Sequence, residues 1–111
     1  MNKRFGSVVV DIAKLRDYCL SDTHPRGRHK ARVFRAHLGL TARDAASLRR
    51  VLLDAARDPL ADLRPAGTDR YGQRYALDVS ATGPGGTATV RSAWIVRTGQ
   101  DVLRFVSCYV L

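Results

Sequence analysis

Along the first half of the chain, apolar residues recur every three or four positions, which is the spacing of one face of an α-helix. A short strand is expected over residues 6–11, and a helix follows over 12–20. A second helix begins at Pro25 or Gly27 and ends at Leu38 before Gly39, and a third runs from the Thr41 cap to about Arg57. The second helix carries a stripe made of Ala31, Phe34 and Leu38, so this face is expected to be buried.

Beyond Pro59 the apolar residues alternate with polar ones, which is the pattern of β-strands. Segments 70–80, 88–97 and 102–111 are separated by the Gly-rich turns TGPGGT and TGQD, and residues 60–67 supply a short additional strand. The expected fold class is therefore α+β, with N-terminal helices packed as one layer on a C-terminal curved antiparallel sheet of three to four strands. Residues 1–111 are expected to form a single domain.

The charge balance narrows the classes of partner. The 111 residues carry a formal net charge of +9, with no glutamate at all, so the chain attracts polyanions such as nucleic acid. An anionic membrane surface and an acidic protein partner are the alternatives. No apolar run is long enough to span a bilayer, and the short run Val8–Val10 is too little for a secretory signal, so a cytoplasmic protein is expected unless a larger chain delivers it.

The densest cluster of basic residues opens the second helix, within THPRGRHKARVF over residues 23–34. The free N–H groups of a helix N-terminus bind anions, so a phosphate among Arg26, Arg28, His29 and Lys30 would relieve their mutual repulsion. The alternative is that these side chains extend into water at a cost of about 0.3 to 1 kcal/mol each. Lys30 differs from the arginines because it lies at the edge of the buried stripe and can reach the sheet.

Histidines are the natural proton carriers near neutral pH. His24 precedes Pro25, where it can act in catalysis or only as a loop or capping residue, and His29 is a second candidate. The expected strands add a cation, a hydroxyl and aromatic planes for stacking bases, namely Arg91, Ser92, Tyr71, Tyr75 and Trp94. The alternative is that Trp94 and Tyr75 belong to the core.

Several kinds of site are not expected. The turn TGPGGT lacks the lysine of a nucleotide-binding loop, and no hydrolase nucleophile motif is present. Cys19 and Cys108 have no neighbour at a metal-ligand spacing, so they are expected to be buried free thiols. No metal and no cofactor are therefore expected.

Taken together, the segments DIAKLRDYCLSDTHPRGRHKARVF, YGQRYALDVSATGPGG, VRSAWIVR and CYVL resemble a bacterial domain family of unknown function. Its members occur as small stand-alone proteins and as C-terminal modules of polymorphic toxins, and they typically carry an H-P-x-G-x-x-K-A-x-F-F-like signature. Nearly the whole chain takes part in the resemblance. The matching residues are His24, Pro25, Gly27, Lys30, Ala31 and Phe34, with Val33 in place of the first Phe.

The order of helices and strands is also similar to that of the barnase, EndoU, colicin and RelE superfamily of metal-independent ribonucleases. That likeness implies RNA cleavage by the 2′-hydroxyl, with transfer RNA as one target and an acidic antitoxin or immunity protein as a partner. The implied roles are His24 or His29 as base or acid, Lys30 and Arg91 stabilising the phosphorane, Ser92 orienting the phosphate, and Arg26 and Arg28 guiding RNA. A non-catalytic module that binds nucleic acid or an acidic partner is the alternative.

Overall fold

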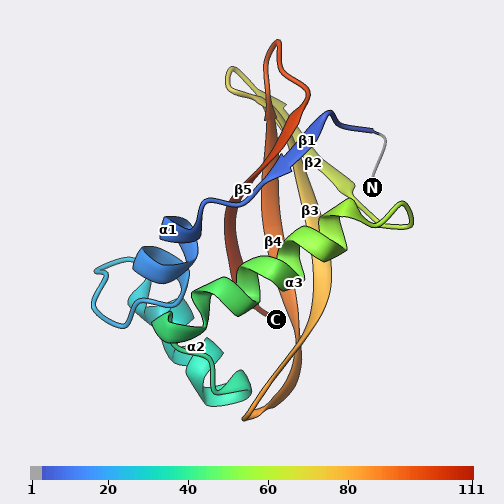
Figure 1. Ribbon diagram of the computed structural model, residues 1–111. Helices are drawn as coiled ribbons and strands as arrows, with labels where there is room; N and C mark the ends of the chain where they lie inside the picture. Colours follow the sequence, from blue (N-terminus) through green and yellow to red (C-terminus); the bar gives the residue numbers. More distant parts are fainter. Residues whose placement is uncertain (1–3) are drawn as a thin grey trace.

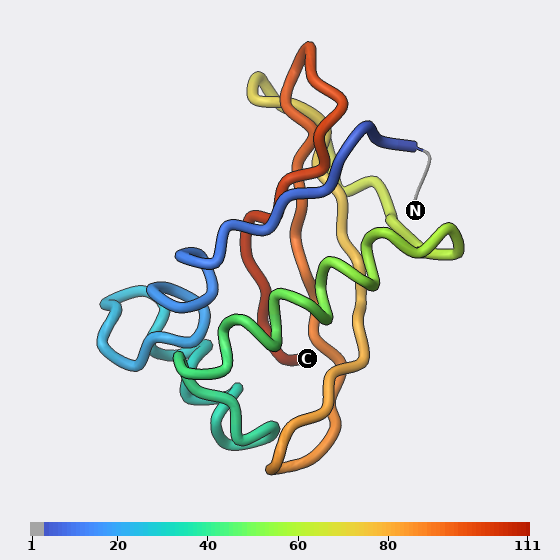
Figure 2. The backbone as a smooth tube through the Cα atoms, viewed as in Figure 1, coloured from blue at the N-terminus to red at the C-terminus, as the bar shows by residue number. Residues whose placement is uncertain are grey.

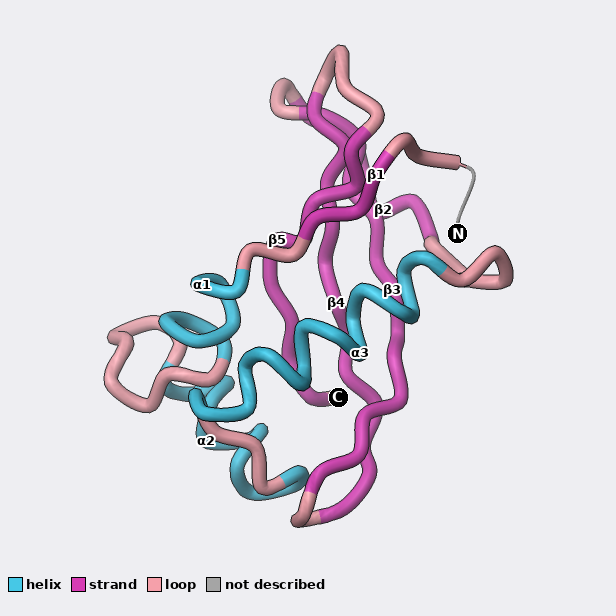
Figure 3. Tube along the Cα trace, in the orientation of Figure 1, coloured by secondary structure: helices cyan, strands magenta, loops and turns pink. Residues whose placement is uncertain are grey.

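The computed structural model describes residues 4–111. Helical segments cover one face and one end of a twisted sheet, and they are drawn in cyan over the magenta strands in Figure 3. In Figure 1, α3 runs across the face of the sheet and α2 lies near its lower end. The expected α+β class is confirmed.

The first expected helix is divided into two pieces. Helix α1 spans Ile12–Lys14 and continues as the π-helical turn η1, Leu15–Cys19. The carboxylate of Asp11 accepts a hydrogen bond from the Ala13 N–H and caps the start, as its position predicted. The wider turn of η1 still buries Leu15 and Cys19 against the rest of the molecule.

The other two helices lie close to their expected places. Helix α2 spans Arg28–Leu38 and buries Ala31, Phe34 and Leu38, and Gly39 ends it in the left-handed region at φ 68°. The 3₁₀ turn η2, Ala42–Asp44, then leads into α3, Ala45–Arg57. Thr41 and Asp44 cap this turn reciprocally, so the predicted cap is confirmed.

The sheet has five strands in the order β1-β5-β4-β3-β2, which is more than the three to four expected. The strands are β1 Ser7–Val9, β2 Arg64–Asp69, β3 Gly72–Gly83, β4 Gly86–Arg97 and β5 Val102–Val110. The meander β2 to β5 is antiparallel as predicted, but β1 pairs in parallel with β5, so the sheet is mixed. The first strand therefore lies beside the start of the last strand at one edge of the sheet, as the tube in Figure 2 shows.

The last strand contains a β-bulge that alternation alone did not reveal. Trp94 faces Phe105 across the ladder, whereas Ala93 faces Ser107, so Val106 is an extra residue on β5. Phe105 and Cys108 consequently both point into the core, although they are three residues apart. A regular strand would have placed Phe105, Ser107 and Tyr109 on one face.

The edge of β5 beyond its pairing with β1 is covered by helical segments. The parallel pairing ends at Val9 and Arg104, so residues 105–110 have no strand neighbour on that side within the described part of the chain. Residues of η1 and α2 pack there instead, and Lys14 Nζ donates a hydrogen bond of 3.2 Å to the Phe105 carbonyl. This cover protects an open edge and brings the first part of the chain against the last strand.

Candidate functional site

Lys30, in the first turn of α2, is the centre of the candidate site. Its Nζ donates a hydrogen bond of 2.9 Å to Ser107 Oγ and lies 5.2 Å from the Tyr18 ring centroid and 5.9 Å from that of Tyr109. The ion pairs formed within residues 4–111 do not include Lys30. Because an ammonium group has three N–H bonds, two remain for an incoming acceptor. A half-buried cation held by rings and a hydroxyl is suited to bind an anion.

Two hollows open on either side of Lys30. The first has a volume of about 590 Å³, and its lining includes Lys14, Asp17, Tyr18, His24, Lys30 and Ser107. The second has a volume of about 300 Å³ and is lined by His29, Lys30, Val33, Tyr109 and Val110. Lys30 therefore forms the ridge between two adjoining spaces.

His24 lines the first hollow, but its ring is held in place by hydrogen bonds from backbone N–H groups just before α2. Its Nδ1 accepts hydrogen bonds of 3.0 Å from the backbone N–H groups of both Arg26 and Gly27. Its ring also packs edge-on against Tyr18 at a centroid distance of 4.7 Å. Because the Nδ1 lone pair faces two donors, the ring carries its proton at Nε2. In this geometry only Nε2 is left to donate a hydrogen bond to a ligand, and accepting a proton would require the ring to give up its capping bonds.

Gly27 lets η1 and α2 come into contact beside Lys30. A Cβ atom built on Gly27 would lie 2.1 Å from the Tyr18 carbonyl oxygen, which is far inside van der Waals contact. The α2 N-terminus can approach the Tyr18 backbone this closely only because residue 27 has no side chain. The glycine thus places Lys30 within reach of the Tyr18 ring.

Two cysteines lie beneath Ser107, and both are buried and free, as expected. Cys19 Sγ is 3.7 Å from Ser107 Oγ. A hydrogen bond from the Cys108 thiol, assisted by Ser107 and by the charge of Lys30, lowers the pKa of Cys19 to about 6 despite its burial. The same hydrogen bond and burial raise the pKa of Cys108. Lys30 therefore lies close to a buried thiol whose pKa its charge helps to lower.

Arg91 lines neither hollow, although it lies next to Tyr109 and hydrogen-bonds the side chain of that tyrosine. Its guanidinium donates two hydrogen bonds, of 2.8 and 2.9 Å, to the Asp78 carboxylate, and Arg64 contacts the same carboxylate at 3.2 Å. Hydrogen bonding to Arg91 lowers the pKa of Asp78 to about 2. Arg91 is the ladder partner of Tyr109, so one tyrosine separates it from Lys30. The structure does not place Arg91 in either hollow beside Lys30.

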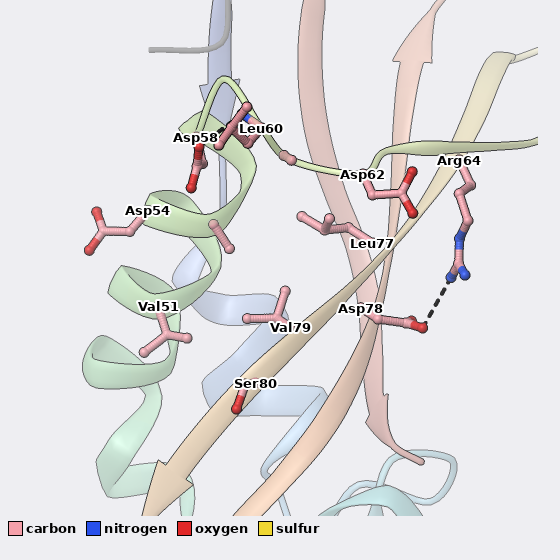
Figure 4. Close-up of a pocket in the computed structure, with 12 residues that line it drawn as sticks. Val51, Asp54, Asp58, Leu60, Asp62, Arg64, Leu77, Asp78, Val79 and Ser80 are labelled. Carbon is pink, nitrogen blue, oxygen red and sulfur yellow. Dashed lines mark hydrogen bonds and ion pairs between the residues drawn. The ribbon is translucent and has the colours of Figure 1, made fainter.

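A further hollow adjoins Asp78 between α3 and the strands β2 and β3, with a volume of about 590 Å³. Figure 4 shows Asp54, Asp58 and Asp62 around it, and the dashed line joins Arg64 to Asp78.

Across residues 4–111, no group of three or more histidine, cysteine or acidic side chains is arranged to hold a metal ion. No described helix has the length and apolar character needed to cross a membrane.

The predictions for Ser92 and Trp94 are corrected by the structure. Both side chains have 0% exposure, so neither can touch a substrate. Ser92 Oγ donates to the Leu77 carbonyl at 2.6 Å and accepts from Trp94 Nε1 at 2.8 Å. This hydroxyl satisfies the indole N–H inside the core, which explains a serine among apolar neighbours.

The remaining predicted residues occupy different parts of the surface. Arg26, Arg28 and His29 are exposed around the start of α2, next to the hollows. Tyr75 is half-buried and packs edge-on against Phe5 at 5.7 Å, while Tyr71 is exposed in the turn between β2 and β3. That turn is at the end of the sheet opposite α2 (Figure 1), so Tyr71 is not brought together with Lys30.

The comparison with protein families decides where the chain belongs. The family described as Domain of unknown function (DUF6883) matches residues 2–111. The chain is a member of the DUF6883 family. No curated protein matches this DUF6883 chain.

Among solved structures, the DUF6883 chain is similar to a chain of a contact-dependent growth inhibition toxin–immunity protein complex from Klebsiella pneumoniae 342. The TM-score is 0.68 at 21% identity, over 93% of this chain and 99% of the other. At this level of identity the likeness shows a shared fold.

Sequence reasoning missed three residues of the DUF6883 site, namely Tyr18, Ser107 and Tyr109. Tyr18 lies in the irregular turn η1, and no pattern predicted which way its ring would point. The bulge at Val106 turns Ser107 and Tyr109 toward Lys30. The one available signal was a serine and a tyrosine interrupting an apolar last strand.

Proposed function

We propose that this DUF6883 domain is a toxin module that cleaves RNA at the cleft around Lys30. The observation that supports it best is a half-buried ammonium group, with no carboxylate partner among the described residues, between two hollows. Such a cation is suited to the charge that develops on phosphorus during transesterification. The net charge of +9 would draw RNA toward this cleft.

In the proposed reaction the 2′-oxygen forms a bond to phosphorus, and the bond from phosphorus to the 5′-oxygen breaks. A base removes the proton of the 2′-hydroxyl, and the leaving 5′-oxygen takes a proton from that protonated base or from water. Lys30 Nζ and the Nε2–H of His24 would bind the phosphorane oxygens from the same hollow. Asp17 lines that hollow, and hydrogen bonding to Arg16 lowers the pKa of its carboxyl. It is therefore ionised and can accept the proton, but only as a weak base that readily gives the proton up to the leaving 5′-oxygen.

A partner follows from the same proposal. The solved structure with this fold is a toxin–immunity complex, and the present chain is strongly basic. An immunity protein for it is therefore expected to be acidic and to cover the cleft or the arginines around it.

The first experiment compares Lys30→Met with Arg32→Met. Both changes remove one positive charge from α2, but Arg32 is exposed and lines neither hollow. Purified proteins are incubated with total transfer RNA, and growth is followed after tightly controlled expression. Lys30→Met is expected to lose about 100-fold or more of cleavage, as when one donor to a developing oxyanion is removed, whereas Arg32→Met stays close to wild type.

The enzyme proposal is wrong if folded wild-type protein, free of any partner, neither cuts RNA nor slows growth. A binding module without catalysis is the second candidate, and the capped ring of His24 favours it. It predicts RNA binding that weakens steeply with salt and releases no product. Product analysis at low and high salt separates the two functions.

A further inference from the structure

The smaller hollow beside Lys30 has the composition of a binding site for a flat, partly apolar group. Its lining combines an aromatic ring, two valines, a histidine and the stem of Lys30. Tyr109 is 41% exposed and Val33 is 37% exposed, which places both among the exposed large hydrophobic residues of the described chain. Its volume of about 300 Å³ is at the lower end of small-molecule pockets.

The neighbouring cation restricts what that group can be. Lys30 lines both hollows, and two of its N–H bonds are unused. A ligand in the smaller hollow is therefore expected to carry an anionic group that binds Lys30. An acidic peptide would satisfy the ammonium but would bring nothing for the face of Tyr109. A nucleotide supplies both, because its base stacks on aromatic rings and its phosphate pairs with lysine.

The strand geometry makes this arrangement specific. The bulge at Val106 turns Tyr109 out of the core, while Cys108 anchors the same strand inside it. The Tyr109 ring centroid lies 5.9 Å from Lys30 Nζ, and that of Tyr18 lies 5.2 Å from it. A ring held on a strand is fixed in place, which reduces the entropy lost on stacking.

We propose that the hollow lined by Tyr109, Val33 and His29 binds one nucleobase of a single-stranded RNA, next to the phosphate held at Lys30. The cleft then takes two consecutive nucleotides, one on each side of the Lys30 ridge. This inference rests on the proposed function for the choice of RNA. It adds the base subsite and assigns Tyr109 as its stacking residue.

The experiment uses a fluorescent 2′-O-methyl RNA tetranucleotide, which cannot be cut because its 2′-oxygen is blocked. Its dissociation constant is measured by anisotropy at one fixed salt concentration. Tyr109→Ala is expected to bind about ten-fold more weakly, which is the size of the loss of one stacked base. Tyr109→Phe, which keeps the ring, and Leu60→Ala, which removes a side chain 90% exposed beyond α3, are expected to bind within about two-fold of wild type.

A second tetranucleotide of the same charge, with its bases replaced by abasic sugars, isolates the stacking contribution. Wild type and Tyr109→Ala are expected to bind it equally. Chemical-shift changes with inorganic phosphate, measured on both proteins, verify that the Lys30 site is intact in the variant. Equal affinity of wild type and Tyr109→Ala for the intact tetranucleotide overturns the subsite, and so does a loss that persists on the abasic one.

Failure of this inference and failure of the proposed function are distinguishable. Because the probe cannot be cleaved, a catalytically inactive domain would still show the ring-dependent loss of affinity. Conversely, RNA cleavage by wild type together with an unchanged affinity in Tyr109→Ala removes the subsite and leaves the toxin proposal standing.

Discussion

At the scale of single residues, the site depends on a chain of contacts that ends in the core. Lys30 donates to Ser107, and since Ser107 Oγ accepts that bond, its own hydroxyl proton is free to point at Cys19. The Cys108 thiol donates to the Cys19 sulfur from the other side and lowers its pKa. The charge of Lys30 contributes to the same lowering, so the ammonium and the buried Cys19 thiol interact across Ser107.

The first prediction concerns this sulfur. Thiolate absorbance near 240 nm is expected to rise with a midpoint at about pH 6 in wild type and to lose that step in Cys19→Ser. Since the folded-state pKa is lowered, this group contributes stability that is present above the unfolded pKa of about 8.5 and lost as pH falls through about 6. Lys30→Met is expected to move the midpoint upward. A midpoint near pH 8.5 in wild type would contradict the proposed contact network.

At the scale of elements, the cleft is the junction of η1, α2 and the edge of β5. Each contributes through a local irregularity: the π-helical turn of η1, the close approach at Gly27, and the bulge at Val106. The bulge also keeps Cys108 in the core while Ser107 and Tyr109 reach Lys30. Irregularities of this kind cluster where side chains have to be aimed at a ligand.

The second prediction tests the approach at Gly27. Gly27→Ala would place a methyl group against the Tyr18 carbonyl, so α2 and η1 would have to separate, at a cost of about 1 to 3 kcal/mol in unfolding free energy. Binding of the tetranucleotide is expected to fall as well, since Lys30 moves with the helix. Urea denaturation and anisotropy measure the two effects.

Gly67→Ala is the matched control for that variant. Its added methyl group would meet nothing within 4 Å, but the residue has φ 107°, so the alanine is strained and also destabilises. It is expected to leave tetranucleotide affinity unchanged. Equal affinity in both variants would mean that the η1–α2 contact does not position the site.

At the scale of the whole molecule, the excess of positive charge lowers the free energy of unfolding. With 19 basic and 10 acidic residues, the net charge is +9, and repulsion among the basic side chains disfavours the compact state. Ion pairs such as Arg91–Asp78 offset part of this, but they lie at the surface, where each contributes little. The positive charge is therefore better explained by binding to a polyanionic partner than by a contribution to the stability of the fold.

The third prediction is a rise of the thermal midpoint by a few degrees when NaCl is raised from about 10 to 150 mM, because salt shortens the range of repulsion from about 30 to 8 Å. The double variant Arg32→Gln/Arg50→Gln, which removes two exposed charges, is expected to melt higher at low salt and to respond less to NaCl. Differential scanning calorimetry measures both. A midpoint that falls with added salt would show that attractive ion pairs dominate instead.

How far the fold follows from the sequence differs between its parts. The stripe Ala31, Phe34, Leu38 predicted α2 and the position of Lys30 at its edge, because helical period and burial are local properties. The parallel pairing of β1 with β5 could not be predicted, since it joins segments almost a chain length apart. Ser92 and Trp94 were candidates for the site, with the core as the alternative for Trp94, and both are buried. Alternation identifies a face of a strand without saying whether that face is the core.

The pairing of β1 with β5 has a consequence for how the protein is made. The strands at the two extremes of the described chain lie side by side, and the cleft draws Lys30 from α2 but Ser107 and Tyr109 from β5. When only the helices and the first four strands have left the ribosome, Lys30 is present, but the β5 residues that form the cleft around it are not. Contacts so distant in sequence form slowly, so the cleft can be assembled only after β5 has left the ribosome.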